Sequence, residues 1–271
     1  MSARDMVQPP RLRTVTQGSI FNHAKCQDFS NSVLGLFISA RCDLAQKKQE
    51  RYIYVPLVRA VDWLDYYVIP KLFSEHHTSI LGSLKTILSQ NKHCPASIDT
   101  FGATQCATLL EGTRALAQYQ KKLSEAEDVT RMMESGIYDK SILSAKAIKS
   151  KTDELVANKV EGAFFIDNII DFQNGNTHLG PHVAVLSEPS SIPRHIALEI
   201  ADGLDHENLI NSGLNYGCID AKGGEMSYIL GNVRSPYIEL ALQKFSALYS
   251  RIGVDDPSTE MKNQIAKEAA R

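Results

Sequence analysis

Apolar residues near the start of the chain form two short runs that favour β-strands. Residues 33–39 and 52–58 are almost continuously apolar and contain β-branched residues. This pattern is typical of strands that are buried on both faces, because a half-exposed strand would alternate apolar and polar residues. Pro56 lacks a backbone N–H, so it predicts that the second strand lies at a sheet edge or ends there.

A second β-rich part begins after about 160 residues of the chain. Residues 162–170 and 182–186 are predicted strands, and the Asn-Gly-Asn sequence between them indicates a turn, so together they predict a hairpin. A helix is predicted to follow, with Pro193 in its first turn and either Ser190 or Ser191 as its cap.

A last helix is predicted over residues 235–252. Ser235 as its cap, Pro236 at the first helical position and Gly253 just past its end follow the usual start and stop signals of helices. Its apolar residues recur at intervals of three and four and form one stripe. The stripe predicts that this helix packs on the core through a single face.

Between the two β-rich parts, residues 60–159 carry apolar residues at helical spacing, and their charges alternate in sign as on a solvated helix face. The order of elements predicts an α+β fold with a small split β core, a large helical insertion at 60–159 and C-terminal helices. We expect residues 1–13 to be a flexible leader. We expect residues 14–271 to form a single domain, because neither β part has enough strands to close alone.

Composition and charge change this picture little but narrow the classes of function. The 271 residues contain 29 Lys and Arg and 31 Asp and Glu, so the net charge is −2 and a general phosphate-binding surface is not implied. No run approaches the roughly 18 apolar residues of a membrane span, and the polar N-terminus does not have the pattern of a signal peptide. The five widely spaced cysteines predict free thiols in a reducing cytoplasm.

The main chemical candidate is Cys42 with Asp43, directly after the predicted strand at 33–39. The adjacent Arg41 can lower the pKa of a thiol, so Cys42 is a candidate nucleophile or, with Asp43, a candidate ligand. A cysteine nucleophile also needs a base, and the histidines lie far away in sequence. The alternative is structural: Cys42 is a small buried thiol and Asp43 caps the next turn, since free cysteine is among the most buried residue types.

Motifs for metals and nucleotides are weak or missing. His23 and Cys26 have a spacing that metals use, but no second tight pair accompanies them, so we predict no metal site. Glycine-rich phosphate loops and the nucleophile elbow are absent, so no cofactor is predicted. Carboxylates such as Asp167 and Glu188 are interpreted as the polar edges of a hairpin. Acidic residues interrupt the basic run at 140–159, which favours a solvated face, while nucleic-acid binding stays open.

The helical insertion suggests contact with a partner. Connections between neighbouring strands are usually only a few residues long, so an insertion of this length is not needed to complete a sheet. We expect the helices to cover one another and part of the β core, and to leave an apolar seam. Trp63, Tyr66 and Tyr67 are the predicted anchors, because large aromatic residues concentrate at binding hot spots. The alternative is that these rings fill the junction between helices and sheet.

Three parts of the chain stand out as a set: Gln17–Phe21, Leu36–Leu44 followed by Tyr52–Pro56, and Ser235–Glu239 leading to Gln243–Ser246 and Arg251–Gly253. Taken together, these segments resemble an uncharacterised group of bacterial accessory proteins. The resemblance implies a multi-gene bacterial system of the phage-defence kind, without an assigned chemistry. The first two segments also resemble the SH3-like barrel of PemK/MazF-type toxins, which implies a barrel core. The arginine and acidic or threonine positions expected for RNA cleavage cannot be placed in this sequence.

Two hypotheses about function follow. The first is a cytoplasmic bacterial interaction or regulatory subunit, with a protein partner from the same operon or a second copy of the chain, and no membrane contact. It rests on the missing catalytic motifs, the helical insertion and the resemblance. The alternative is a hydrolase or ribonuclease that uses Cys42 and Asp43 with a histidine brought near by the fold.

Overall fold

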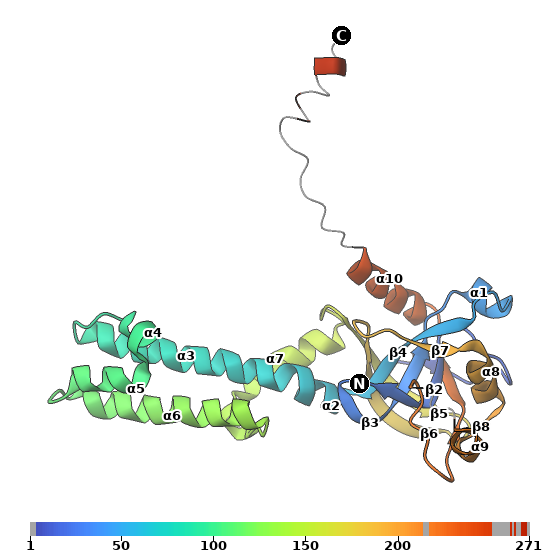
Figure 1. The fold of residues 1–271 in the computed structure, drawn as a ribbon, viewed down its shortest axis with the longest axis horizontal. Helices are drawn as coiled ribbons and strands as arrows, with labels where there is room; N and C mark the ends of the chain where they lie inside the picture. Colours follow the sequence, from blue (N-terminus) through green and yellow to red (C-terminus); the bar gives the residue numbers. More distant parts are fainter. Residues whose placement is uncertain (1–3, 214–216, 251–260, 262, 264–266, 270–271) are drawn as a thin grey trace.

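A curled β-sheet and a long helical arm that projects from it make up most of the molecule (Figure 1). The computed structural model describes residues 4–213, 217–250, 261, 263 and 267–269. The arm, defined here as residues 60–156, leaves the sheet after one strand and returns to it at the next. The predicted α+β fold, with a split β core and a large helical insertion, is therefore confirmed.

The main sheet is antiparallel, with the strand order β1-β10-β2-β3-β4-β6-β5 and with β7 beside β4. Its strands are β1 (Val7–Gln8), β2 (Ser19–Cys26), β3 (Phe29–Phe37), β4 (Arg51–Arg59), β5 (Ala163–Asp171), β6 (Thr177–Val185), β7 (Ser190–Pro193) and β10 (Ile229–Val233). A two-stranded sheet pairs β8 (Leu204–Asp205) with β9 (Met226–Ser227). The predicted hairpin is β5–β6, whose returning strand begins five residues earlier than expected, at Thr177.

Helices form the arm and cover the sheet. The arm contains α2 (Ala60–Trp63), the π-helix η1 (Leu64–Val68), α3 (Ile69–Gln90), α4 (Ser97–Phe101), α5 (Ala103–Cys106), η2 (Ala107–Leu110), α6 (Ala115–Ser135), η3 (Lys140–Ile142) and α7 (Ala145–Val156). The others are α1 (Arg41–Ala45), α8 (Arg194–Asp202), α9 (His206–Asn211) and α10 (Tyr237–Tyr249). Within the described residues, no helix combines the length and apolar character that crossing a membrane requires.

Both faces of the central strands are buried, as the sequence predicts. On β4, Val55 and Leu57 belong to the core that α10 covers. Tyr52 and Tyr54 point to the opposite face of β4 and belong to the core that α8 covers. Successive side chains of a strand point to opposite faces, so a strand between two cores needs an unbroken apolar run.

The sheet curls without closing into a continuous barrel. β1 and β5 stand at opposite ends of the strand order, and no ladder between them occurs in the described part of the chain. Just beyond β5, the backbone N–H of Phe172 donates to the carbonyl oxygen of Leu230 in β10 at 3.0 Å. The curled interior is filled by apolar residues of strands β1 to β6 and β10. The SH3-like barrel that the resemblance implies is therefore not closed here.

The predicted edge position of Pro56 is wrong, because β4 lies between β3 and two further strands. On one side, Pro56 is opposite Gly35 of β3. On the other side, β7 pairs with residues 51–54 and β6 pairs with residues 57–59, so the partner strand changes at Pro56. A residue without an N–H is tolerated inside a central strand at such an interruption of the ladder.

The predicted serine cap of the helix after residue 190 is also wrong. Ser190 and Ser191 lie in β7 and pair with β4, and α8 begins only after Pro193. This pairing buries Ile192 completely. Sheet hydrogen bonds and burial therefore outweigh the local capping signal at this position.

The last helix is shorter at its start than the sequence predicts. α10 begins at Tyr237, with Pro236 as the cap residue and without a side-chain cap hydrogen bond, so Ser235 is not its cap. Ile238 and Ala241 are buried against the sheet, which confirms the predicted single packing face. Ile252 and Gly253, the predicted helix end, lie outside the described residues.

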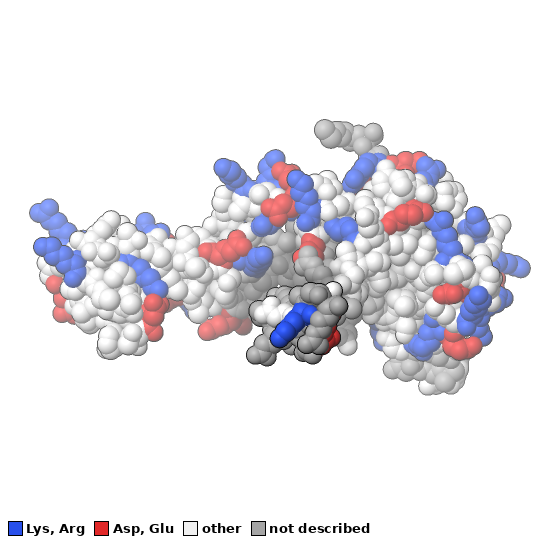
Figure 2. All heavy atoms as spheres, turned by 90° about the horizontal axis from the view of Figure 1, so that it is seen from above, with Lys and Arg blue, Asp and Glu red and all other residues white. Residues whose placement is uncertain are grey.

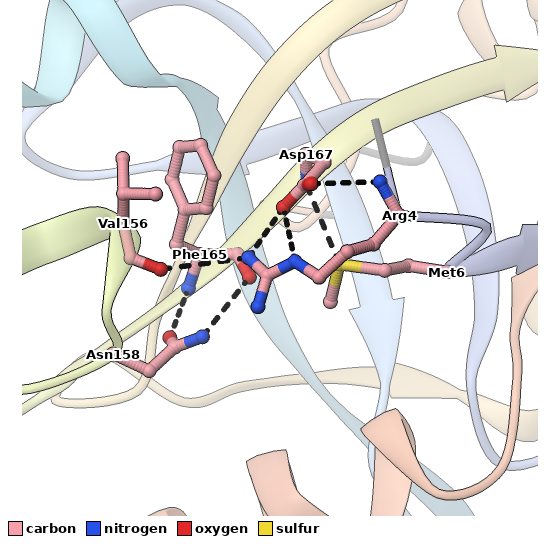
Figure 3. A network of polar contacts seen from close by, with 6 residues as sticks. All are labelled: Arg4, Met6, Val156, Asn158, Phe165 and Asp167. Carbon is pink, nitrogen blue, oxygen red and sulfur yellow. Dashed lines mark hydrogen bonds and ion pairs between the residues drawn. The ribbon is translucent and has the colours of Figure 1, made fainter. Parts of the chain in front are cut away.

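Part of the predicted leader belongs to the folded sheet. β1 pairs with β10, and Met6 and Val7 are almost fully buried. The backbone N–H of Arg4 donates to Oδ2 of Asp167 on β5 at 2.8 Å, and its Nε donates to Oδ1 at 2.8 Å (Figure 3). Its Nη2 donates to the carbonyl oxygen of Val156 at the end of α7. The N-terminal segment thus ties the returning end of the arm to the sheet.

The arm has an apolar interior of its own. α3 and α6 pack side by side, and two buried clusters between the arm helices contain no residue of the sheet. A third cluster, at the base of the arm, packs Trp63 and Leu72 against Phe165, Val183 and Val185 of β5 and β6. On the face shown in Figure 2, positive and negative side chains are interspersed along the arm, as expected for solvated helices.

Gly35 in β3 allows the ring of Phe21 to lie directly on the strand. A Cβ at position 35 would lie 2.2 Å from Cε1 of Phe21. That ring is fixed by Phe37 and Tyr54, whose centroids lie 4.8 and 5.3 Å away. We therefore expect Gly35→Ala to lower the free energy of unfolding by about 1–3 kcal/mol, measured by urea denaturation.

Gly82→Ala is the matched control for this substitution. Gly82 lies on an exposed face of α3, and no atom lies within 4 Å of where its Cβ would be. Alanine has the higher helix propensity, so this change should raise stability by up to about 1 kcal/mol. A Gly35→Ala protein as stable as the wild type would contradict the close packing of Phe21.

Candidate functional site

A hollow of about 670 Å³ lies where the base of the arm meets the sheet. We call it the junction groove. Strands β2, β3, β4 and β6 form its floor and sides, together with the first residues of the arm. Its apolar lining consists of Phe29, Val33, Leu34, Leu57, Val58 and Leu179, and its polar lining of Asn22, His23, Asp28, Arg59, Asp62, Tyr66 and His182. Concave apolar walls with a few convergent polar groups are typical of ligand sites.

His23 reaches the groove from an irregular position in β2. The register between β2 and β3 shifts between Phe21 and Ala24, and His23 has φ 57°, in the left-handed region that few non-glycine residues adopt. Its Nδ1 lies 3.2 Å from Oε2 of Glu225, and its ring packs edge-on against the buried His206 at a centroid distance of 4.9 Å. Burial lowers the pKa of His23, which leaves the ring neutral at neutral pH.

His182 of β6 lies on another wall of the same groove. Its Nδ1 lies 3.0 Å from the carbonyl oxygen of Gly180, and burial lowers the pKa of the ring. The structure therefore brings together His23 and His182, two of the histidines that the sequence leaves far apart. Cys42 is not among the residues that line this groove.

Two carboxyl groups meet beside the groove in what we call the acid–tyrosine network, formed by Cys26, Asp28, Tyr67 and Glu188. The Tyr67 hydroxyl donates to Oδ2 of Asp28 at 2.7 Å and lies 2.8 Å from Oε1 of Glu188. Sγ of Cys26 donates to Oε2 of Glu188 at 3.3 Å. Glu188, interpreted from the sequence as a polar hairpin edge, is thus part of a side-chain network.

The pKa values of the two carboxyl groups of this network are shifted in opposite directions. Burial, together with the hydrogen bond to Asp28, raises the pKa of Glu188. Hydrogen bonds with Glu188, Tyr67 and Tyr66 lower the pKa of Asp28. Of the two carboxyl groups, Asp28 is therefore the one that loses its proton first as the pH rises. Burial also raises the pKa of Cys26 to about 12, so this thiol stays protonated.

The predicted partner anchors occupy three different environments. Trp63 is 6% exposed and packs in the cluster that joins the arm to the sheet, as the alternative interpretation expects. Tyr66 is 46% exposed and lines the groove, whereas Tyr67 is half-buried in the network. The three rings and Phe29 form one aromatic cluster with centroid distances from 4.8 to 6.2 Å.

Cys42 is exposed on α1, so the predicted buried thiol is wrong. Its Sγ donates to Oδ1 of Asp43 at 3.7 Å, and Asp43 also accepts a hydrogen bond from Nε2 of Gln49 at 2.7 Å. The guanidinium group of Arg41 forms an ion pair with Glu239 at 2.5 Å. The hydrogen bond of the Cys42 thiol thus goes to a carboxylate rather than to a histidine. A catalytic role of Cys42 and Asp43 stays a prediction.

The structure shows no grouping that suits a metal ion. Within the described residues, no three or more His, Cys, Asp and Glu side chains come together as ligands. His23 and Cys26 have a spacing that metals use, but they contact different residues. His23 lies against Glu225, and Cys26 donates to Glu188.

Several lysines of the basic run at 140–159 form ion pairs with acidic residues on the surface of the arm. Lys149 pairs with Asp153 at 3.1 Å and Lys151 pairs with Glu154 at 3.2 Å, both along α7. Lys140 pairs with Asp65 at 2.6 Å. These pairs neutralise much of the positive charge that a nucleic acid would require.

The chain matches no known family model, no curated protein and no solved structure. Sequence reasoning identified Tyr66 and Tyr67 but missed Asp28 and Phe29 as their neighbours. These residues lie at the β2–β3 turn, and no local pattern connects them to an aromatic pair 39 residues away.

Cys42→Ala tests the exposed position of this thiol. We expect a change of no more than about 0.5 kcal/mol in the free energy of unfolding, because the side chain packs on little and makes one weak hydrogen bond. Cys106→Ala, in the buried interior of the arm, is the control and should cost about 1 kcal/mol or more. A large loss of stability in Cys42→Ala would contradict its exposure. Loss of biological activity without loss of stability would support a chemical role.

The fluorescence of Trp63, the single tryptophan, tests its place in the junction. We expect blue-shifted emission and slow quenching by iodide in the free protein, because the ring is removed from water. Unfolding in urea should shift the emission to the red and restore rapid quenching. A Trp63 that iodide quenches as readily in the folded protein as in urea would contradict the observed packing.

Proposed function

We propose that this protein is an interaction subunit that holds a protein partner in the junction groove and along the arm. The observation that carries the proposal is that only the base of the arm packs on the sheet, whereas the rest of the arm buries its apolar residues in two clusters that contain no residue of the sheet. Ordering the arm costs about 1–2 kcal/mol per residue in backbone entropy, and its own clusters offset that cost without serving the sheet. A role outside the folding of the sheet accounts for a projection of this size.

The surface of the arm and groove suits recognition of a protein. Tyr66 offers a partly exposed aromatic ring within a concave apolar wall. Phe101, in α4 toward the end of the arm farthest from the sheet, is 67% exposed, and Leu109 in η2 is 42% exposed (Figure 1). Aromatic anchors in desolvated pockets contribute most of the binding energy at protein interfaces.

The cellular location and the biological system in this proposal follow from the sequence. All five cysteines are free thiols, which supports a cytoplasmic location. The resemblance to bacterial accessory proteins extends the proposal to a regulatory subunit of a multi-gene, antiviral defence system, with a partner from the same operon. The hydrolase or ribonuclease alternative gains no support, because the hydrogen bond of the Cys42 thiol within the described residues goes to Asp43 and not to a histidine.

Site-specific photo-cross-linking tests the proposed surface. A benzophenone amino acid would replace Tyr66 or Phe101, with the protein expressed in its source cells together with its neighbouring genes. Leu12, which is 82% exposed and lies outside groove and arm, is the matched control position. We expect a discrete cross-linked partner from Tyr66 and Phe101, and none from Leu12.

The cross-linking outcomes separate the possible partners. A product at twice the mass of the chain would identify a second copy as the partner instead of an operon neighbour. Absence of any product from both Tyr66 and Phe101 would contradict the proposal, as would equal labelling from Leu12.

A further inference from the structure

We infer that the junction groove binds the cationic end of a lysine or arginine side chain presented by the partner, between the carboxylate of Asp28 and the rings of Phe29 and Tyr66. The inference rests on the proposed function, because it names the chemistry of the group that the partner inserts. The groove volume of about 670 Å³ is ample for one long side chain with its surrounding backbone.

The charge of the groove favours a cation. Arg59 and Asp62 neutralise each other through two hydrogen bonds, Nε to Oδ2 at 2.6 Å and Nη2 to Oδ1 at 2.7 Å. His23 and His182 line the groove as neutral rings at neutral pH. Asp28 is then the lining residue whose charge is not balanced.

No cation of the described chain is paired with Asp28. Its hydrogen-bond partners are the hydroxyl groups of Tyr67 and Tyr66 and the carboxyl group of Glu188, and none of these is a cation. A carboxylate has about four lone-pair positions, so these contacts leave acceptor capacity toward the groove. The network thus holds Asp28 ionised and in place, and it leaves the carboxylate open to an incoming N–H donor.

The aromatic rings supply the second element of recognition. Phe29 and Tyr66 line the groove next to Asp28, with ring centroids 5.0 Å apart and planes at 41°. Tyr67 continues this wall, with its centroid 4.8 Å from that of Tyr66. An ammonium or guanidinium group within about 6 Å of such faces is attracted by the ring quadrupole.

The remaining lining matches the aliphatic part of the same side chain. Val33, Leu57 and Val58 provide apolar wall beside the aromatic rings. Lysine and arginine bury their methylene stems on such surfaces while the charged end reaches a polar partner. A bare metal ion fits less well, because no three-ligand group occurs within the described residues and aromatic carbons are not metal donors.

The inference is tested by titrating the full-length protein with small probes. n-Butylamine represents the lysine side chain, n-butylguanidine the arginine side chain, and n-butanol the same stem without charge. Binding is followed by NMR through the methyl resonances of Leu57 and Val58. We expect both cations to cause saturable shifts and n-butanol to bind about tenfold more weakly.

Variants of the groove and a matched control complete the experiment. Asp28→Asn removes the charge, and Tyr66→Leu removes a ring and a hydrogen bond to Asp28 while keeping an apolar surface. Each should weaken n-butylamine binding about tenfold. Asp65→Asn removes an equal charge from the exposed pair with Lys140, outside the groove, and should leave binding within about twofold of wild type.

The outcomes distinguish this inference from the proposed function. Equal binding of n-butylamine and n-butanol, or unchanged binding in both Asp28→Asn and Tyr66→Leu, would overturn cation recognition, even if cross-links from Tyr66 persist. Selective cation binding without cross-links from Tyr66 or Phe101 would overturn the protein partner as the source of the cation.

Discussion

The pairing of β4 with three other strands is the constraint on which the rest of the structure depends. β3 lies along one side of β4, while β7 and then β6 share the other side. Because α2 begins directly after β4, and β6 pairs with both β4 and β5, the two ends of the arm are held at the same part of the sheet. An insertion with adjacent ends has to project, and α3 and α6 pack on each other to form a helical hairpin.

The junction groove follows from the same arrangement. Its walls come from the strands around β4 and from the first turns of the arm, so it exists only where the two meet. Trp63 packs in the cluster that joins the arm to β5 and β6, whereas Tyr66 is 46% exposed and lines the groove. At the other end of the arm, Arg4 ties Val156 to Asp167 and fixes the return to β5 (Figure 3).

The pattern of neighbouring residues predicted those elements whose burial follows from the spacing of apolar residues along one segment. The strand around Val55 and the packing face of α10 were predictable. Burial on both faces requires an unbroken apolar run, and burial of one helix face requires apolar residues at helical spacing. Prediction from neighbouring residues failed where pairing with a distant strand determines the local structure. Pro56 is accommodated by a change of partner along β4, and Ser190 is drawn into β7 by pairing with the same strand. Neither event has a signal in the neighbouring residues.

The sequence by itself determined the split β core and the helical insertion between its two parts, because apolar periodicity is a property of consecutive residues. Only the tertiary structure decided which side chains share a site. Tyr67 meets Asp28 across 39 residues and Glu188 across 121, and Cys42, the most conspicuous residue in the sequence, meets neither. The physical reason is register: long-range pairing sets which face each residue points to, and a shift of one residue would reverse it.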